Sequence, residues 1–176
     1  MRQRFLIIIG IAAVALVAST AALAGTLTAT AAVTGASGIS MSLPSDPSIS
    51  DTLDGTDQTV SWSAALGVVD ARGTGAGWNI TMGATTFSDG SGHTLAAGSI
   101  TGVSAACHGG NSCTSATNSV TYPLTLSGTA AKFFNAASGS GMGKIDVTPS
   151  VDVAIPGNAY AGTYTSTVTL AAVSGP

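Results

Sequence analysis

The chain has 176 residues, only 7% of them charged, and its five Lys and Arg residues face eight acidic residues, all of them Asp. Two of the five cations lie in the first four residues, so the rest of the chain carries three, too few to neutralise a nucleic-acid backbone or to hold an anionic membrane surface. We therefore expect no nucleic acid among its partners. The apolar content of 45% is higher than that of a typical disordered chain.

The N-terminal segment has the layout of a secretory signal peptide. Two arginines precede an uncharged apolar stretch at 5–17, and Ala-Leu-Ala at 22–24 places small residues where a signal peptidase cuts. A permanent membrane anchor is the alternative, because the apolar stretch is nearly of spanning length, but hydroxyl residues interrupt it. We therefore expect a signal peptide at 1–24, a single domain at 25–176, and no membrane association after cleavage.

Alternation of apolar and hydroxyl-bearing side chains with a period of two recurs after the signal peptide. It predicts strands in the runs 26–33, 59–64, 78–82, 120–126, 144–155 and 163–170. Each run places its apolar set on one face of a strand, so that one face is buried and the other is wet, which is typical of antiparallel sheets. With Gly, Pro, Asn and Asp clusters between the runs, the pattern predicts an all-β, antiparallel β-sandwich of about seven to nine short strands with Greek-key-like connections.

Three stretches depart from this pattern. Pro123 and Pro149 lie inside strand runs, and because proline donates no backbone hydrogen bond, each is expected at an edge strand or a bulge. Thr129–Ala136 is the one stretch where we expect a helical turn.

Motifs for catalysis and cofactor binding are missing from the sequence. It contains no Glu, no zinc-protease motif, no C-x-x-C pair and no nucleophile elbow, and its two histidines, His93 and His108, lie in loops rich in Gly and Ser. Gly139–Lys144 resembles a phosphate-binding loop but lacks its first glycine and its final hydroxyl residue, so we expect a turn. The sequence predicts a protein that is not an enzyme and has no cofactor.

A metal site is also not expected. Four aspartates crowd into the loop 46–57, where calcium binding is the alternative to a solvated acidic loop, but the spacing matches no known calcium loop. Cys107 and Cys113 are the only cysteines, and an exported protein meets an oxidising compartment. We predict a disulfide between them. Zinc is the weaker alternative, because His108 adds only a third ligand.

Two motifs resemble those of a known family. The segment Asp70–Ile80, with Asp-x-Arg-Gly leading into Gly-Trp-Asn-Ile, resembles the first motif of the WxL family of Gram-positive surface domains, where Gly-Trp-x-Leu is usual. Tyr164–Leu170 is similar to the second motif, Y-x-x-x-W-T-L, with Val168 in place of the tryptophan. The resemblance covers 25–176 and implies a secreted protein, extracellular or associated non-covalently with the cell-wall polymer peptidoglycan or with other surface proteins.

The resemblance makes Trp78, Arg72 and Tyr164 the candidate binding residues. The residues themselves also predict packing roles: Trp78 as a large core residue, Arg72 paired with Asp70, and Tyr164 half-buried with its hydroxyl bonded. We favour packing over ligand contact for Trp78 and Tyr164.

A second function is compatible with the same strands. The chain could be a structural subunit of an extracellular filament or surface layer, self-associating by β-strand addition with the segment 26–33 as donor.

Overall fold

The computed structural model describes residues 28–176, so the predicted signal peptide lies outside the described residues. The chain divides into two units, 1–32 and 33–176. Of the first, Thr28–Ala32 is described, and it is exposed and without regular secondary structure. Between residues 28 and 176 no helix is long and apolar enough to cross a membrane.

The larger sheet of the second unit has six strands. They are β1 (Ile39–Ser42), β2 (Gln58–Ser63), β3 (Leu66–Asp70), β7 (Ser99–Cys107), β8 (Leu124–Thr125) and β10 (Gly143–Ile155). The order is β1-β3-β10-β7-β8, and β2 also pairs with β10. The long strand β10 is therefore central, with β3 along its first half and β2 along its second half, all antiparallel.

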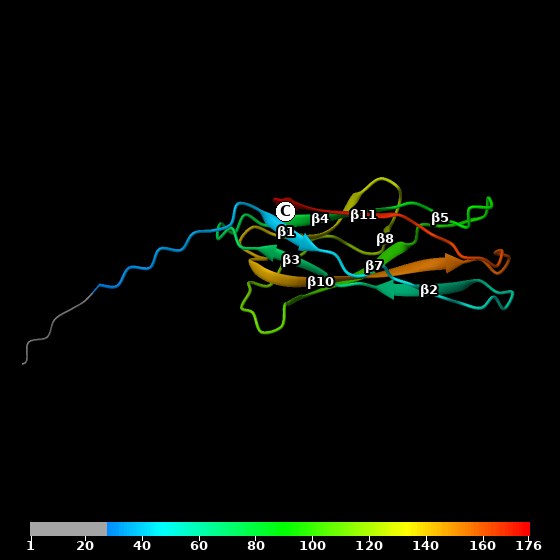
Figure 1. Cartoon of the computed structure of the whole chain (residues 1–176), viewed down its shortest axis with the longest axis horizontal. Coiled ribbons are helices and arrows are strands. Elements are labelled where there is room, and N and C mark those ends of the chain that lie inside the picture. Colours follow the sequence, from blue (N-terminus) through cyan, green and yellow to red (C-terminus); the bar gives the residue numbers. More distant parts are fainter. Residues whose placement is uncertain (1–27) are drawn as a thin grey trace, which may run out of the picture. The chain divides into compact units, whose positions relative to one another are not determined.

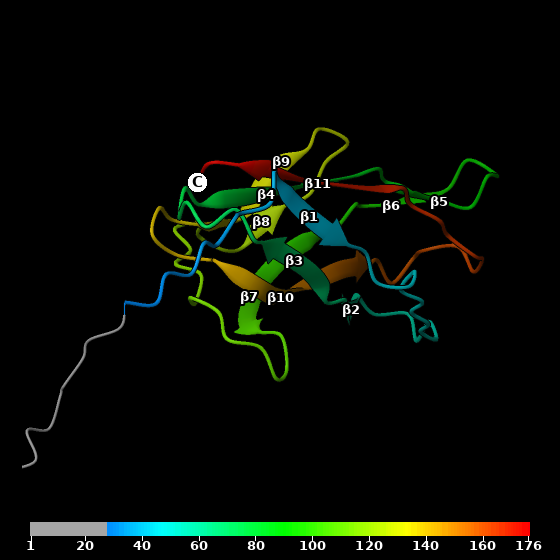
Figure 2. The same cartoon turned by 60° about the vertical axis from the view of Figure 1, so that its left-hand side comes forward.

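A three-stranded sheet forms the second layer. It places β4 (Trp78–Ala84) between β11 (Val168–Ser174) and β9 (Ala131–Ala136), again antiparallel. A short hairpin of β5 (Phe87–Ser88) and β6 (Thr94–Leu95) extends from the end of β4. Figures 1 and 2 show β4, β9 and β11 stacked over β3 and β10.

One hydrophobic core lies between the two sheets. Its largest fully buried side chains come from alternate positions of both layers: Trp78, Ile80 and Met82 from β4, Phe133 from β9, Leu66 and Val68 from β3, Ile100 from β7, and Ile145, Val147, Val151 and Val153 from β10. The predicted all-β antiparallel fold is confirmed, and the two packed sheets have the arrangement of a sandwich. In the described part of the chain eight strands have four residues or more, and three have two.

The helical turn predicted at Thr129–Ala136 is wrong, because most of that stretch forms β9. Phe133 and Phe134 are both buried, which breaks the period-two pattern that identifies a strand from sequence. The register with β4 shifts between Ile80 and Thr81, and such a bulge lets two consecutive side chains turn inward.

The strand predicted at 26–33 is also wrong for the residues that the structure describes. Residues 28–33 form no strand, and Val33 is 94% exposed. The edge of the larger sheet is taken instead by β1, whose register pairs Ile39 with Asp70 of β3. Small alanines and threonines bury too little apolar surface to hold a strand without such a neighbour.

The prolines follow the sequence-based expectation in part. Pro149 lies inside β10, next to a register shift between Ser150 and Val151, at the point where pairing passes from β3 to β2. Pro123 follows a cis peptide bond and immediately precedes β8, so that only Leu124 and Thr125 of the predicted run 120–126 are a strand.

Candidate functional site

The first motif folds into a buried ion pair at one end of the sandwich. Asp70 ends β3 with a side chain that is 0% exposed, and Arg72, whose side chain is 10% exposed, contacts it through two nitrogens at 2.8 and 2.9 Å. The guanidinium also donates to the carbonyl of Gly77 at 2.7 Å and to the hydroxyl of Ser174. Arg72 thus ties β3, the glycine-rich loop and β11 together.

Trp78 lies beside this ion pair and is completely buried. Its indole Nε1 donates to the carbonyl of Gly141 at 2.9 Å, and its ring lies 5.8 Å from that of Phe134. Gly77 and Gly141 have positive φ, and a Cβ on either would lie within 2.5 Å of Ala136. The first motif therefore supplies packing and hydrogen bonds at this end of the sandwich, and Trp78 presents no surface to a ligand.

The predicted disulfide is present between Cys107 and Cys113, in the exposed loop that follows β7. Because it closes a loop of only a few residues, we expect its reduction to lower the free energy of unfolding by about 2 kcal/mol or less. Melting with and without reductant, together with a thiol count of the denatured chain, tests this. Two reactive thiols before reduction, or unfolding upon reduction, would contradict it.

Tyr164 lies at the other end of the sandwich. Trp78 pairs with Ser174 at one end of β4 and Ala84 pairs with Val168 at its other end, so Tyr164 lies beyond a strand that spans about 20 Å. Its hydroxyl donates to the carbonyl of Tyr160 at 2.9 Å, and the side chain is half-buried as predicted. The structure therefore does not bring the three candidate binding residues together.

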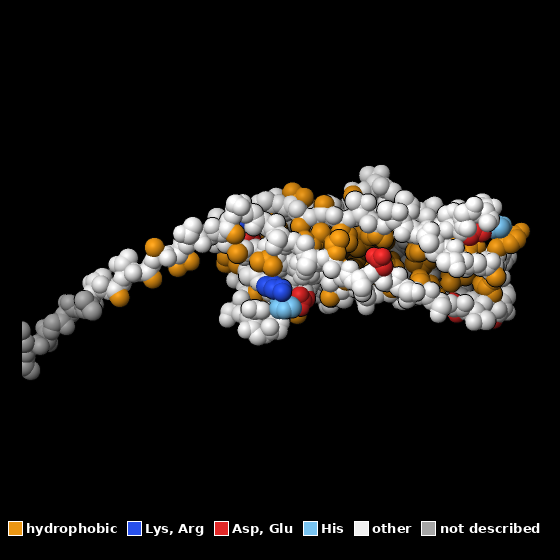
Figure 3. Space-filling view, in the orientation of Figure 1, with side chains coloured by type: hydrophobic (Ala, Val, Ile, Leu, Met, Phe, Trp, Pro, Cys, Tyr) orange, Lys and Arg blue, Asp and Glu red, His pale blue; other side chains and the backbone are white. Residues whose placement is uncertain are grey.

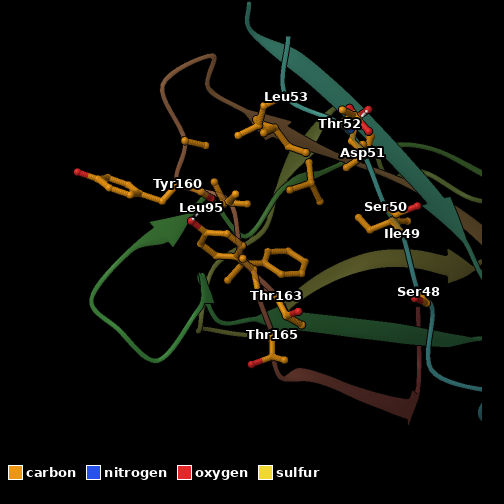
Figure 4. Close-up of a pocket in the computed structure, with 18 of the residues that line it drawn as sticks. Ser48, Ile49, Ser50, Asp51, Thr52, Leu53, Leu95, Tyr160, Thr163 and Thr165 are labelled. Atoms are coloured by element: carbon orange, nitrogen blue, oxygen red, sulfur yellow. Dashed lines mark hydrogen bonds between the residues drawn. The ribbon is translucent and has the colours of Figure 1, made fainter. Parts of the chain in front are cut away.

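Tyr164 instead lines a cleft of about 690 Å³, within the range of binding sites for small molecules. We call it the sheet-end cleft. One side is the coil Pro47–Leu53, the other is the segment Ala159–Thr165, and the floor is apolar, made by Val60, Phe87, Leu95, Val153 and Ile155. Hydrophobic side chains are visible in this opening between the layers (Figure 3). In Figure 4, Tyr160 and Leu95 lie across the cleft from Ser50 and Asp51.

An aromatic pair stands at the rim of this cleft. The rings of Tyr160 and His93 stack with centroids 3.9 Å apart and planes 17° from parallel, and Tyr160 remains 64% exposed. Both also line an adjoining hollow of about 220 Å³, which shares Leu95, Ala159, Tyr160 and Tyr164 with the cleft. The two spaces thus adjoin at Tyr160, and we call them together the groove.

Hydrogen bonds hold the aromatic pair in place. Asp89 accepts from the backbone amides of Ser91 and His93, and its second oxygen lies 2.5 Å from Nδ1 of His93. The His93 side chain, followed by the Ser91 amide, lowers the pKa of the Asp89 carboxyl below its ordinary value. The segment that carries Tyr160 and Tyr164 is anchored in turn by a pair of backbone bonds between Thr165 and Ser88.

Polar groups also lie on the opposite side of the cleft. Asp51 is exposed, and Oε1 of Gln58 is buried without a hydrogen-bond partner while its Nε2 donates to the carbonyl of Thr52. Gln58 pairs with Ile155 and so shares its face of the sheet, but it does not line the cleft. A ligand here meets an apolar floor with hydrogen-bonding groups around it.

The charges around the cleft are negative. Asp51 lines it, and no Lys or Arg is among its lining residues or those of the adjoining hollow. Asp54 and Asp57 belong to the same acidic loop, where Thr56 lowers the pKa of Asp54 by hydrogen bonding. No group of three residues suited to hold a metal ion is found in 28–176, the acidic loop included.

The histidines form no catalytic arrangement with a serine. His93 bonds to Asp89, and His108 bonds to Asp146 at 2.9 Å. No serine hydroxyl bonds either imidazole in the part of the chain described. Each histidine therefore has an orienting carboxylate but no bonded nucleophile.

The cleft was not predicted from the sequence, except for Tyr164. Its two sides and its floor come from several segments far apart in the chain, and nothing in the local pattern connects them. One hint was available: the chain has only three tyrosines, and Tyr160 stands four residues before Tyr164 in a Pro-Gly-Asn loop, where a large aromatic residue has no strand to pack against.

The fold and this site define a β-sandwich domain with a groove open at one end. Residues 25–173 match the family described as "WxL domain surface cell wall-binding", and the chain belongs to this family. Its membership supports association with the cell wall at the cell surface. No curated protein and no solved structure matches the chain.

Proposed function

We propose that this protein is an exported, non-catalytic domain that binds peptidoglycan without a covalent link. The observation that carries the proposal is the family match over 25–173. Two features of the described residues support it. The outward side chains of β2 all bear hydroxyl groups, and the sheet-end cleft and its adjoining hollow, which combine exposed aromatic and polar groups, contain no Lys or Arg.

The test is sedimentation of the purified exported chain with insoluble peptidoglycan sacculi. We expect saturable binding that is released by denaturant, because a folded, non-covalent site is required. Cellulose serves as the control for unspecific trapping. A chain that stays in the supernatant, or that pellets equally with cellulose, contradicts the proposal, and release of soluble fragments from the sacculi would make it an enzyme.

Assembly into a filament or surface layer is the second candidate function. It is favoured by one observation: Thr28–Val33, the described part of the predicted donor segment, is exposed and pairs with no strand. A filament subunit would polymerise without any wall present, and negative-stain microscopy of the purified chain separates the two functions.

A further inference from the structure

We propose that the sheet-end cleft and the adjoining hollow together bind the neutral glycan strand of the wall, with Tyr160 as the residue on which a sugar ring stacks. This inference rests on the proposed function and assigns it a site. Tyr160 is one member of the aromatic pair with His93. One face of Tyr160 is covered by His93 at 3.9 Å, yet the side chain is 64% exposed, so its remaining surface is free for a ligand.

Tyr160 is also held in position before any ligand arrives. Its ring is supported by His93, which is fixed by Asp89, and its backbone carbonyl is held by the hydroxyl of Tyr164. An exposed aromatic ring that loses little conformational freedom on binding is an effective contact, since ordering costs oppose association.

The chemistry of the groove matches N-acetylated sugars. A pyranose ring has an apolar face and a rim of hydroxyl groups, and its acetamido group adds a methyl group and an N–H donor. The groove offers the matching parts: an apolar floor around Leu95 and Val153, the acceptor carboxylate of Asp51, and the hydroxyls of Thr163 and Thr165.

Charge selects among wall polymers. Asp51 and the absence of Lys and Arg from the lining oppose polyanionic chains, because like charges brought together raise the free energy of the complex. The glycan backbone of peptidoglycan carries neutral sugars. The groove also comprises two adjoining spaces, of about 690 and 220 Å³, which together have room for more than one sugar.

The probe is the hexamer of β-1,4-linked N-acetylglucosamine, titrated into the exported chain and followed by NMR and calorimetry. We expect shifts at Tyr160, Tyr164 and Asp51 and none at Trp78. Tyr160→Ala should weaken binding about tenfold, whereas Tyr160→Phe, which keeps the ring, should bind within about twofold of wild type. Val173→Ala, an exposed apolar residue near the other end of β11, is the matched control and should change nothing.

Three outcomes would overturn the assignment. If Tyr160→Ala melts like wild type and binds both hexamer and sacculi as tightly, the site is elsewhere and the proposed function still stands. If wild-type chain fails to sediment with sacculi, the proposed function fails and the site with it. If the hexamer has no effect and Tyr160→Ala instead abolishes self-association seen by sedimentation velocity, the cleft receives a second copy of the chain.

Discussion

Replacing Trp78 by Ala is expected to destabilise the domain strongly. The side chain is 0% exposed, packs near Phe134 and donates to Gly141, so the change leaves a large cavity and a carbonyl without its donor. Truncating such a residue costs about 3–5 kcal/mol. For a domain of this size that lowers the melting temperature by roughly 6–20 °C.

Thermal unfolding followed by circular dichroism measures the effect. The matched control is Trp62→Ala on β2, because Trp62 is only partly buried against the core and should cost less. Wall binding measured below the melting transition should be retained by Trp78→Ala, since Trp78 has no exposed surface. An unchanged melting curve together with lost binding would make Trp78 a ligand contact and contradict its packing role.

Replacing Arg72 by Met is expected to have the second large effect, because it leaves the fully buried carboxylate of Asp70 without its partner. Breaking one side of a buried ion pair costs about 3–5 kcal/mol, a large share of the 5–15 kcal/mol typical of a whole domain. Lys132→Met is the matched control. Lys132 is exposed on β9 and makes no salt bridge within the described residues, so its loss should leave the melting temperature nearly unchanged.

The dependence of stability on pH tests the same ion pair independently. The hydrogen bond from the Arg72 side chain lowers the pKa of Asp70 below its ordinary value of 3.8. A carboxylate with a lowered pKa in the folded state stabilises the fold at pH values above 3.8, and this contribution is lost as the pH falls through the folded-state pKa. Wild type should therefore lose stability below about pH 4, and Arg72→Met should lose less. Parallel acid profiles for the two would contradict the role of the pair.

Sequence patterns predicted the strands in which one face is uniformly apolar. The alternation of Val60 and Trp62 identified β2, and that of Trp78, Ile80 and Met82 identified β4. The same rule missed β3, where the last inward position is Asp70, a charged residue that becomes tolerable in the core only because Arg72 reaches it. It failed at β9, where a bulge turns two adjacent phenylalanines inward.

The packing roles of the first motif were predicted correctly from the sequence. The position of Tyr164 relative to that motif was not. Local reasoning predicted the pair of Asp70 with Arg72 and the burial of Trp78, since all three lie within nine residues of chain. It did not predict that Tyr164 would lie at the opposite end of the sandwich, because that depends on the register of β11 with β4. The groove around Tyr160 depends in addition on a long acidic coil, 43–57, whose path no periodic pattern describes.

The central claim, non-covalent binding to wall glycan, is tested most directly by one binding isotherm. Purified exported chain is titrated onto sacculi stripped of anionic polymers, at low and at high salt. We expect saturable binding that changes little with salt, since the groove carries no Lys or Arg to attract a polyanion. Binding that appears only on sacculi retaining their anionic polymers, and that vanishes at high salt, would contradict the account.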